Sequence, residues 1–244
     1  MIYRYIGFQN EAESKLKTIS KNRLWFSSPQ KFNDPFDCDF PVSSSFTVDE
    51  FIEFTYGCYE LTGKDPKNII RKYKIADIES RQALCHSILN AYKTKMSSHG
   101  ICCFSERWDS ILMWSHYADK HAGICVGYDD SNNDDLLIEV KYSTHYPELH
   151  IKETIKDAGK VMEKYLLTKS SDWLYEREHR IIHKSCCDDC DESPFPIVEV
   201  IFGVKADEQL KRDVIGSMDS NVLYYDAIHE PKGKYGLSRK QYSK

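Results

Sequence analysis

Short runs of apolar and aromatic residues recur along the chain, and polar, turn-forming stretches separate them. Runs of this length and composition predict β-strands. The predicted strands span residues 2–5, 23–28, 100–106, 123–129, 136–143, 173–182, 196–204 and 221–230. No glycine-rich phosphate loop follows any of these strands, which argues against a Rossmann or P-loop fold.

Apolar residues at helical spacing predict helices between the strands. These helices span residues 10–22, 109–123, 148–169 and 205–218, and residues 47–98 read as helical throughout. Thr47 and Glu50 have the spacing of a capping box at the start of this helical block. We predict a single α+β domain over residues 1–230, with short strands in mixed or antiparallel sheets. Residues 47–98 form its helical insertion, and residues 231–244 form a loosely held basic tail.

Composition narrows the class of protein. The net charge of −5 argues against a general nucleic-acid coat. No apolar run has the length of a signal peptide or membrane span, so we expect no membrane partner and a cytoplasmic location. The nine cysteines are then expected to be reduced. The cluster Cys186–Cys190, after His183, has no second C-x-x-C beside it, so we interpret it as a surface loop rather than a zinc site.

The segment WLYEREHRII, residues 173–182, places two glutamates two positions apart on a predicted strand. That spacing puts Glu176 and Glu178 on one face. A carboxylate pair in a cleft suits general acid–base work, because one member stays ionised while the other is raised in pKa. The alternative is a solvated face whose charge Arg180 offsets.

The loop FNDPFDCDF, residues 32–40, concentrates polar turn-forming residues between aromatic rings. One interpretation is a ligand-gripping or metal-binding loop that uses Asn33, Asp34, Asp37 and Asp39. The other is a turn whose polar side chains bond their own backbone, while Phe32 and Phe36 anchor it in the core.

The helix MWSHYADKH, residues 113–121, carries aromatic and basic side chains in stripes. Trp114, Tyr117 and His121 form one stripe, and His116 lies on the next. Such a face could stack a base or a nicotinamide ring, and it could equally be part of the core.

Taken together, YRY, LWFSSPQKFNDPFD, CFSE…LMWSHYADKHAGICVGY and W-x-Y-E-x-E-x-R resemble a bacterial and phage domain family of unknown function. The same chain also resembles, more distantly, the ADP-ribosyltransferases. These have a first strand with Arg or His, then a strand with small hydroxyl residues, and a late strand with E-x-E. Here Arg4, Ser27–Ser28 and the pair Glu176 and Glu178 take those places.

The second resemblance implies an enzyme that cleaves NAD and transfers ADP-ribose to a nucleic acid or protein acceptor, in phage defence or toxicity. Glu178 would stabilise the oxocarbenium-like transition state, Glu176 would orient or deprotonate the acceptor, and Arg4 would hold the pyrophosphate. The expected NAD contacts are Arg4, Tyr3, Ser27, Asn33, Asp37, Trp114, His116 and Tyr117.

Two other functions are compatible with the same residues. A metal-dependent nuclease or hydrolase would use Asp37, Asp39, Glu176 and Glu178 as oxygen ligands. A non-enzymatic sensor or binding module would use the carboxylates only to balance Arg180.

Overall fold

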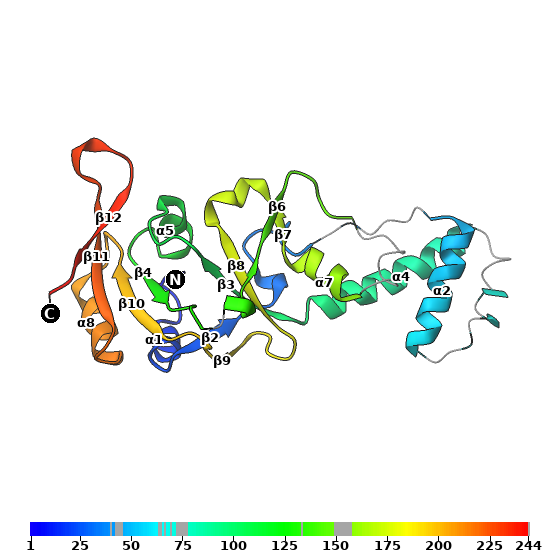
Figure 1. The fold of residues 1–244 in the computed structure, drawn as a ribbon, viewed down its shortest axis with the longest axis horizontal. Coiled ribbons are helices and arrows are strands. Elements are labelled where there is room, and N and C mark those ends of the chain that lie inside the picture. The colour runs from blue at the N-terminus through cyan, green and yellow to red at the C-terminus, as the bar shows by residue number, and fades with distance from the viewer. Residues whose placement is uncertain are drawn as a thin grey trace. The chain divides into compact units, whose positions relative to one another are not determined.

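The computed structural model describes residues 1–39, 41, 46–62, 65, 67–68, 70–71, 78–132, 134–148 and 158–243 (Figure 1). The chain divides into two compact units. Unit 1 comprises residues 1–27, 100–140 and 172–244, and unit 2 comprises residues 28–99 and 141–171. The predicted insertion at residues 47–98 lies within unit 2.

Unit 1 is built around a sheet whose described strands run in the order β12-β11-β10-β4-β1-β3-β8-β5. These strands are β1 (Ile2–Ile6), β3 (Gly100–Ser105), β4 (Ile124–Tyr128), β5 (Ile138–Glu139), β8 (Glu178–His183), β10 (Ile197–Phe202), β11 (Leu223–His229) and β12 (Leu237–Gln241). Their pairings are antiparallel apart from β10 with β11, which are parallel and connected through helix α8 (Glu208–Ser217). The mixed sheet and its helices confirm the α+β prediction.

Side chains alternate between the two faces of this sheet, and each face has its own apolar cluster. Helices α1 (Ala12–Ser20) and α8 pack on the face of Ile2 and Val126. Helix α5 (Ile111–Tyr117) packs on the opposite face, where Trp114 joins the cluster that contains Tyr3.

The register places one residue from each of five strands in a single row. Tyr3 of β1 pairs with Ser105 of β3, and Ser105 pairs with Glu178 of β8. In the other direction Tyr3 pairs with Gly127 of β4, which pairs with Glu199 of β10. Because residues directly opposite each other share a face, the side chains of this row all belong to the same face as α5.

The C-terminal segment is not the loosely held tail that its basic composition predicted. Strand β12 pairs with β11 along its length, and Leu237 is buried. Arg239 forms an ion pair with the buried Glu199, and its guanidinium lies 4.6 Å from the centre of the Tyr225 ring. Burial of an apolar side chain and neutralisation of a buried carboxylate both hold this strand on the sheet.

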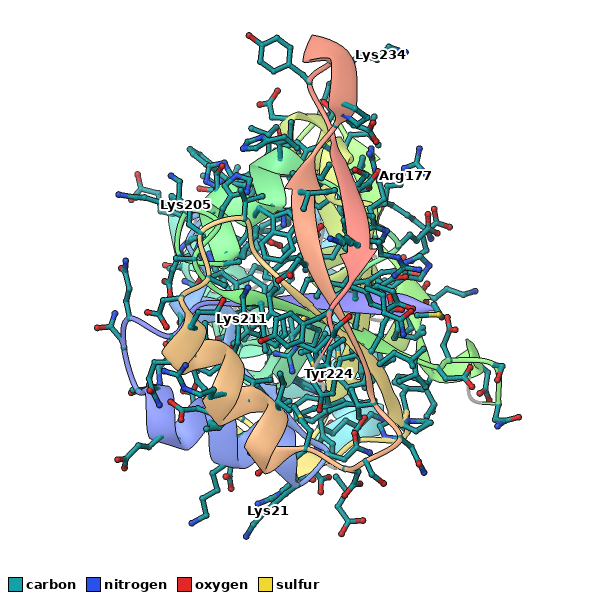
Figure 2. All side chains as sticks on the ribbon, turned by 90° about the vertical axis from the view of Figure 1, so that its left-hand side faces the viewer. Lys21, Arg177, Lys205, Lys211, Tyr224 and Lys234 are labelled. Carbon is teal, nitrogen blue, oxygen red and sulfur yellow. The ribbon has the colours of Figure 1, made fainter. Side chains whose placement is uncertain are left out.

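Helix α8 is attached to the same edge of the sheet by Lys211 (Figure 2). Its Nζ lies 2.9 Å from Asp226 Oδ1 of β11 and 5.2 Å from the centre of the Tyr242 ring. The stem of this lysine therefore covers aromatic surface while its ammonium is neutralised.

A smaller sheet of unit 1 pairs β2 (Arg23–Phe26) with β9 (Asp189–Glu192). The cysteine cluster that we interpreted as a surface loop therefore enters β9 at Asp189. Before that strand, Cys186 N donates to His183 Nδ1 over 2.8 Å, which closes the turn.

The predicted strand at residues 173–182 is wrong in its first half. Residues Ser171–Glu176 form a 3-10 helix, η3, and β8 begins only at Glu178. Arg177 lies between them with φ 43°, in the left-handed region. This residue interrupts the extended backbone, so the two glutamates do not stand side by side on one strand.

Unit 2 contains helices α2 (Val48–Thr62), α4 (Ile78–Met96) and α7 (Ala158–Leu166), and β6 (Lys141–Ser143) pairs in parallel with β7 (Thr168–Ser170). Of the helix predicted at 148–169, residues 149–157 lie outside the described part of the chain. Short 3-10 turns complete the described elements: η1 (Pro29–Lys31) in unit 2, and η2 (Asp134–Leu136) and η4 (Pro231–Gly233) in unit 1.

The capping box at the start of α2 is confirmed. Thr47 N donates to Glu50 Oε2 over 2.7 Å, and Glu50 N donates to Thr47 Oγ1 over 3.2 Å. These reciprocal bonds satisfy two backbone donors at the helix start. Behind them, Phe51, Phe54 and Cys85 form the buried contact between α2 and α4.

Candidate functional site

The two glutamates lie at the junction between η3 and β8, and the end of β3 holds that junction in place. Ser105 Oγ donates to the main-chain oxygen of Glu176 over 2.5 Å, and Arg107 N donates to Ser105 Oγ over 3.1 Å. Glu106 N donates to Arg177 O over 3.2 Å. The surrounding hydrogen bonds thus impose the strained backbone of Arg177, a type of strain that is concentrated at functional sites.

Glu178 is bound by a buried arginine on its own strand. Arg180 Nε donates to Glu178 Oε1 over 2.7 Å, and Arg180 Nη2 donates to Glu178 Oε2 over 3.1 Å. Arg180 is 0% exposed and Glu178 is 3% exposed. The bidentate geometry fixes the Glu178 carboxylate and offsets its charge. For Glu178, this agrees with the alternative in which Arg180 balances the glutamate charge.

Glu176 has a different partner. The hydroxyl of Tyr117, at the end of α5, donates to Glu176 Oε1 over 2.8 Å. His116 precedes that tyrosine on an exposed position, and its ring centre lies 6.0 Å from that of Trp173 in η3. Tyr117, His116 and Trp173 therefore form an aromatic border beside the buried Glu176.

Tyr3 and Arg4 occupy opposite faces of the sheet, because adjacent strand residues point in opposite directions. Tyr3 shares the face of Glu178, but its hydroxyl is hydrogen-bonded to Glu199. Burial and this carboxylate together raise the pKa of Tyr3 to about 12. Arg4 lies on the other face, 5.7 Å from the centre of the Phe104 ring. Arg4 and Glu178 therefore lie on opposite faces of the sheet.

Trp114 and Ser27 also lie apart from the carboxylates. Trp114 is fully buried, and its Nε1 donates to Trp108 O over 2.7 Å, so it has no free ring face for nicotinamide. Ser27 forms a β-bridge with Ile101. Ile101 lies four positions from Ser105 on β3, about 13 Å along the strand, and the residue paired with Glu178 is Ser105 rather than a neighbour of Ser27.

Asn33 and Asp37 belong to unit 2, whereas both glutamates belong to unit 1. The carboxylate of Asp37 is buried with Lys169, whose Nζ lies 3.4 Å from Asp37 Oδ2. Asn33 is exposed on the same loop. Asp37 and Lys169 therefore form a buried ion pair within unit 2.

The metal-dependent hypothesis has no support in the geometry. Among the described residues, no group of three or more His, Cys, Asp or Glu side chains is placed to hold a metal ion. Asp39, one of the proposed ligands, forms an ion pair with Lys93 in unit 2.

No helix in the described part of the chain is both long and apolar enough to cross a membrane.

Ser105 is the residue of this site that the sequence analysis did not select. It ends the strand GICCFS, and a small hydroxyl at the end of a strand is the signal that could have marked it. Its importance depends on the register with β1 and β8, which the local sequence does not contain.

Residues 113–181 match the model of a family described as a protein of unknown function (DUF2971). The matched segment runs from α5 to β8 and includes Tyr117, Glu176, Glu178 and Arg180. This agrees with the resemblance to a domain family of unknown function that the motifs indicated. No curated protein and no solved structure matches the chain.

Proposed function

We propose that unit 1 is an NAD-cleaving enzyme of the ADP-ribosyltransferase type, with Glu178 and Glu176 as its catalytic carboxylates. The observation that carries the proposal is the strand order β1-β3-β8, with Tyr3, Ser105 and Glu178 in one row. The resemblance has a first strand, a hydroxyl-bearing strand and a late glutamate strand, and it assigned the hydroxyls to Ser27–Ser28. In the proposal Ser105 takes that place, because β3 lies between β1 and β8 whereas β2 belongs to the smaller sheet.

The proposed reaction breaks the bond between nicotinamide and ribose, and the bonding electron pair leaves with nicotinamide. Positive charge then develops on the ribose, where a fixed carboxylate stabilises it in a water-poor site. Arg180 is a positioning residue here, because its two hydrogen bonds set the orientation of Glu178. An acceptor hydroxyl or ring nitrogen attacks the ribose carbon, and Glu176 takes the proton that the acceptor loses.

The nicotinamide ring needs an accessible aromatic surface, and Trp114 cannot supply it. Trp173 is the replacement, since it is partly exposed and lies in η3, the element that ends in Glu176. His116 contacts the Trp173 ring and is itself exposed. These positions support a stacking role for Trp173 and a bordering role for His116.

The test is release of free nicotinamide, measured by mass spectrometry after incubation with NAD alone and with DNA, RNA or protein added. We expect Glu176→Gln to abolish release with little effect on folding, because a glutamine oxygen still accepts from Tyr117. Glu106→Gln is the matched control on a half-exposed carboxylate of the neighbouring loop. A wild-type protein that releases no nicotinamide under any of these conditions would refute the proposal, as would equal release by Glu176→Gln and wild type.

A further inference from the structure

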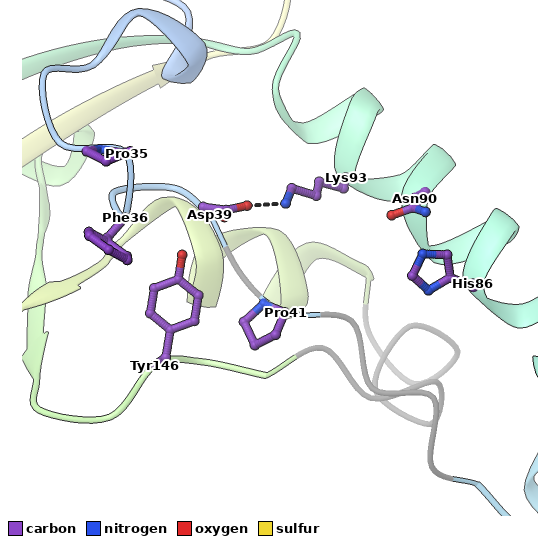
Figure 3. A pocket seen from close by; sticks show the side chains of 8 residues that line it. All are labelled: Pro35, Phe36, Asp39, Pro41, His86, Asn90, Lys93 and Tyr146. Carbon is purple, nitrogen blue, oxygen red and sulfur yellow. Dashed lines mark hydrogen bonds and ion pairs between the residues drawn. The ribbon is translucent and has the colours of Figure 1, made fainter.

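Unit 2 contains a cavity of about 520 Å³ that the proposed reaction does not use (Figure 3). One wall comes from the loop after η1 and from the segment after β6, and it consists of Pro35, Phe36, Pro41 and Tyr146. The other wall is α4. All these residues belong to one compact unit, and the volume lies within the usual range for small-molecule sites.

The aromatic rings of this cavity are held outward rather than buried. Phe36 is 66% exposed and Tyr146 is 41% exposed, so the alternative in which Phe36 anchors its loop in the core is wrong. Their ring centres are 6.2 Å apart at 88°. Phe36 N donates to Asp34 Oδ1 over 2.9 Å, which fixes the turn. The next residue, Asp37, is anchored by the buried ion pair with Lys169.

These contacts of the neighbouring residues hold the Phe36 ring in its exposed position. A turn closed by an aspartate side chain and a buried ion pair at the following residue leave the ring little freedom to fold inward. Exposed aromatic rings supported in this way are typical of surfaces that stack a flat ligand.

The opposite wall is polar. His86, Asn90 and Lys93 follow one another at spacings of four and three residues along α4, so they share one helix face toward the cavity (Figure 3). Lys93 forms an ion pair with Asp39, which also lines the cavity. The lysine and aspartate charges offset each other, and His86 and Asn90 add neutral polar groups to the same wall.

These two walls select a chemical class of ligand. Flat aromatic surfaces favour a planar ring, and the offset charges disfavour an isolated anion or cation. The amide of Asn90 offers a donor and an acceptor on one group, which is the arrangement that reads the edge of a base. We propose that this cavity binds a nucleobase, stacked against Phe36 or Tyr146 and hydrogen-bonded at its edge by the α4 wall.

The inference does not depend on the proposed NAD cleavage, because every lining residue lies in unit 2 and every carboxylate of that reaction lies in unit 1. The base can belong to a free nucleoside or nucleotide, or to a single-stranded nucleic acid. Both sources present the same planar, hydrogen-bonding ring, and the experiment separates them.

The test is isothermal titration of the full chain with the four common ribonucleosides, their monophosphates, and single-stranded homopolymers of each base. We expect binding that Phe36→Ala and Tyr146→Ala each weaken about 10-fold, the size of effect found for loss of one stacking ring. Tyr56→Ala is the control, because Tyr56 is exposed to a similar degree (46%) on α2 and does not line the cavity. Asn90→Leu should reduce the differences in affinity among bases.

Homopolymers that bind much more tightly than monophosphates identify a nucleic-acid strand as the source of the base, and equal affinities identify the free nucleotide. Because Lys93 is offset by Asp39, affinity for the homopolymers should fall only slightly as salt is raised. The proposal is overturned if none of these ligands binds the wild-type protein. It is also overturned if Phe36→Ala and Tyr146→Ala bind as wild type does, or if Tyr56→Ala weakens binding equally.

Discussion

Replacement of Arg180 by methionine should strongly destabilise unit 1, because it leaves Glu178 as a buried carboxylate without its bidentate partner. Both side chains are almost completely removed from solvent. Breaking a buried ion pair by removal of one partner costs about 3–5 kcal/mol, a large part of the roughly 5–15 kcal/mol that stabilises a domain. We expect Glu178→Gln alone to destabilise the protein as well, because Arg180 then loses its bidentate carboxylate while it stays buried.

The double variant Glu178→Gln/Arg180→Met removes both charges together. Neutral replacements of a whole buried pair are far less destabilising than removal of one partner. The two single costs should therefore exceed the double cost by about 3 kcal/mol, which is the coupling energy of the pair.

The free energy of unfolding is measured by urea denaturation with tryptophan fluorescence. Trp25, Trp108, Trp114 and Trp173 all lie in unit 1, so the signal reports on that unit. Arg177→Met is the matched control. Its side chain is 59% exposed and its Nη1 lies 4.0 Å from Glu106 Oε2, so its loss should change stability by less than about 1 kcal/mol.

A loss below about 1 kcal/mol for Arg180→Met would refute the reasoning, since only a solvated pair would be so weak. Additive single costs, with no coupling between the two sites, would refute it equally. A stable double variant would also show whether loss of NAD cleavage in Glu178→Gln results from missing chemistry or from unfolding.

Three further substitutions test the strain, the titration and the packing of unit 1. Arg177→Gly should raise the free energy of unfolding by about 0.5 kcal/mol, because relief of the left-handed strain exceeds the added chain entropy, and lower stability in the urea assay would contradict this. The raised pKa of Tyr3 means that its neutral form stabilises the fold fully below pH 10 and less as pH rises toward 12. Melting temperatures at pH 9–12 should therefore fall less steeply for Tyr3→Phe, and parallel curves would contradict the assignment. Gly127→Ala should destabilise by about 1–3 kcal/mol, because its Cβ would lie 2.6 Å from Glu199 Cγ. The control Gly216→Ala in α8, with open space around it, should stabilise instead.

Local patterns in the sequence were sufficient for the elements and caps that local contacts determine. Thr47 and Glu50 of the capping box are only three positions apart, and both of its hydrogen bonds form. The α+β class followed from the mixture of short apolar runs and helical periodicity. Each of these patterns reflects which face of an element is buried, and that is a local property of the sequence.

The errors all concern contacts between residues far apart in the chain. The 3-10 helix before Glu178 ends at Glu176. The hydroxyl of Ser105, 71 residues earlier in the chain, donates to the main-chain oxygen of Glu176 and holds this end in place. The C-terminal strand is held by Arg239 on Glu199, 40 residues earlier. That Arg4 and Glu178 lie on opposite faces could not be predicted, because the pattern of one strand does not reveal the register between strands.

The position of β1 has a consequence for how the chain folds during synthesis. It leaves the ribosome before its partners β3 and β4, which end at residues 105 and 128. At roughly 5–20 residues per second, β1 waits about 6–25 s for its second neighbour. Strands β8 and β10, which extend the sheet on each side, follow later still. Pairings this distant slow the folding of a domain. We therefore expect the nascent N-terminal segment to be a binding site for chaperones that protect unpaired strands.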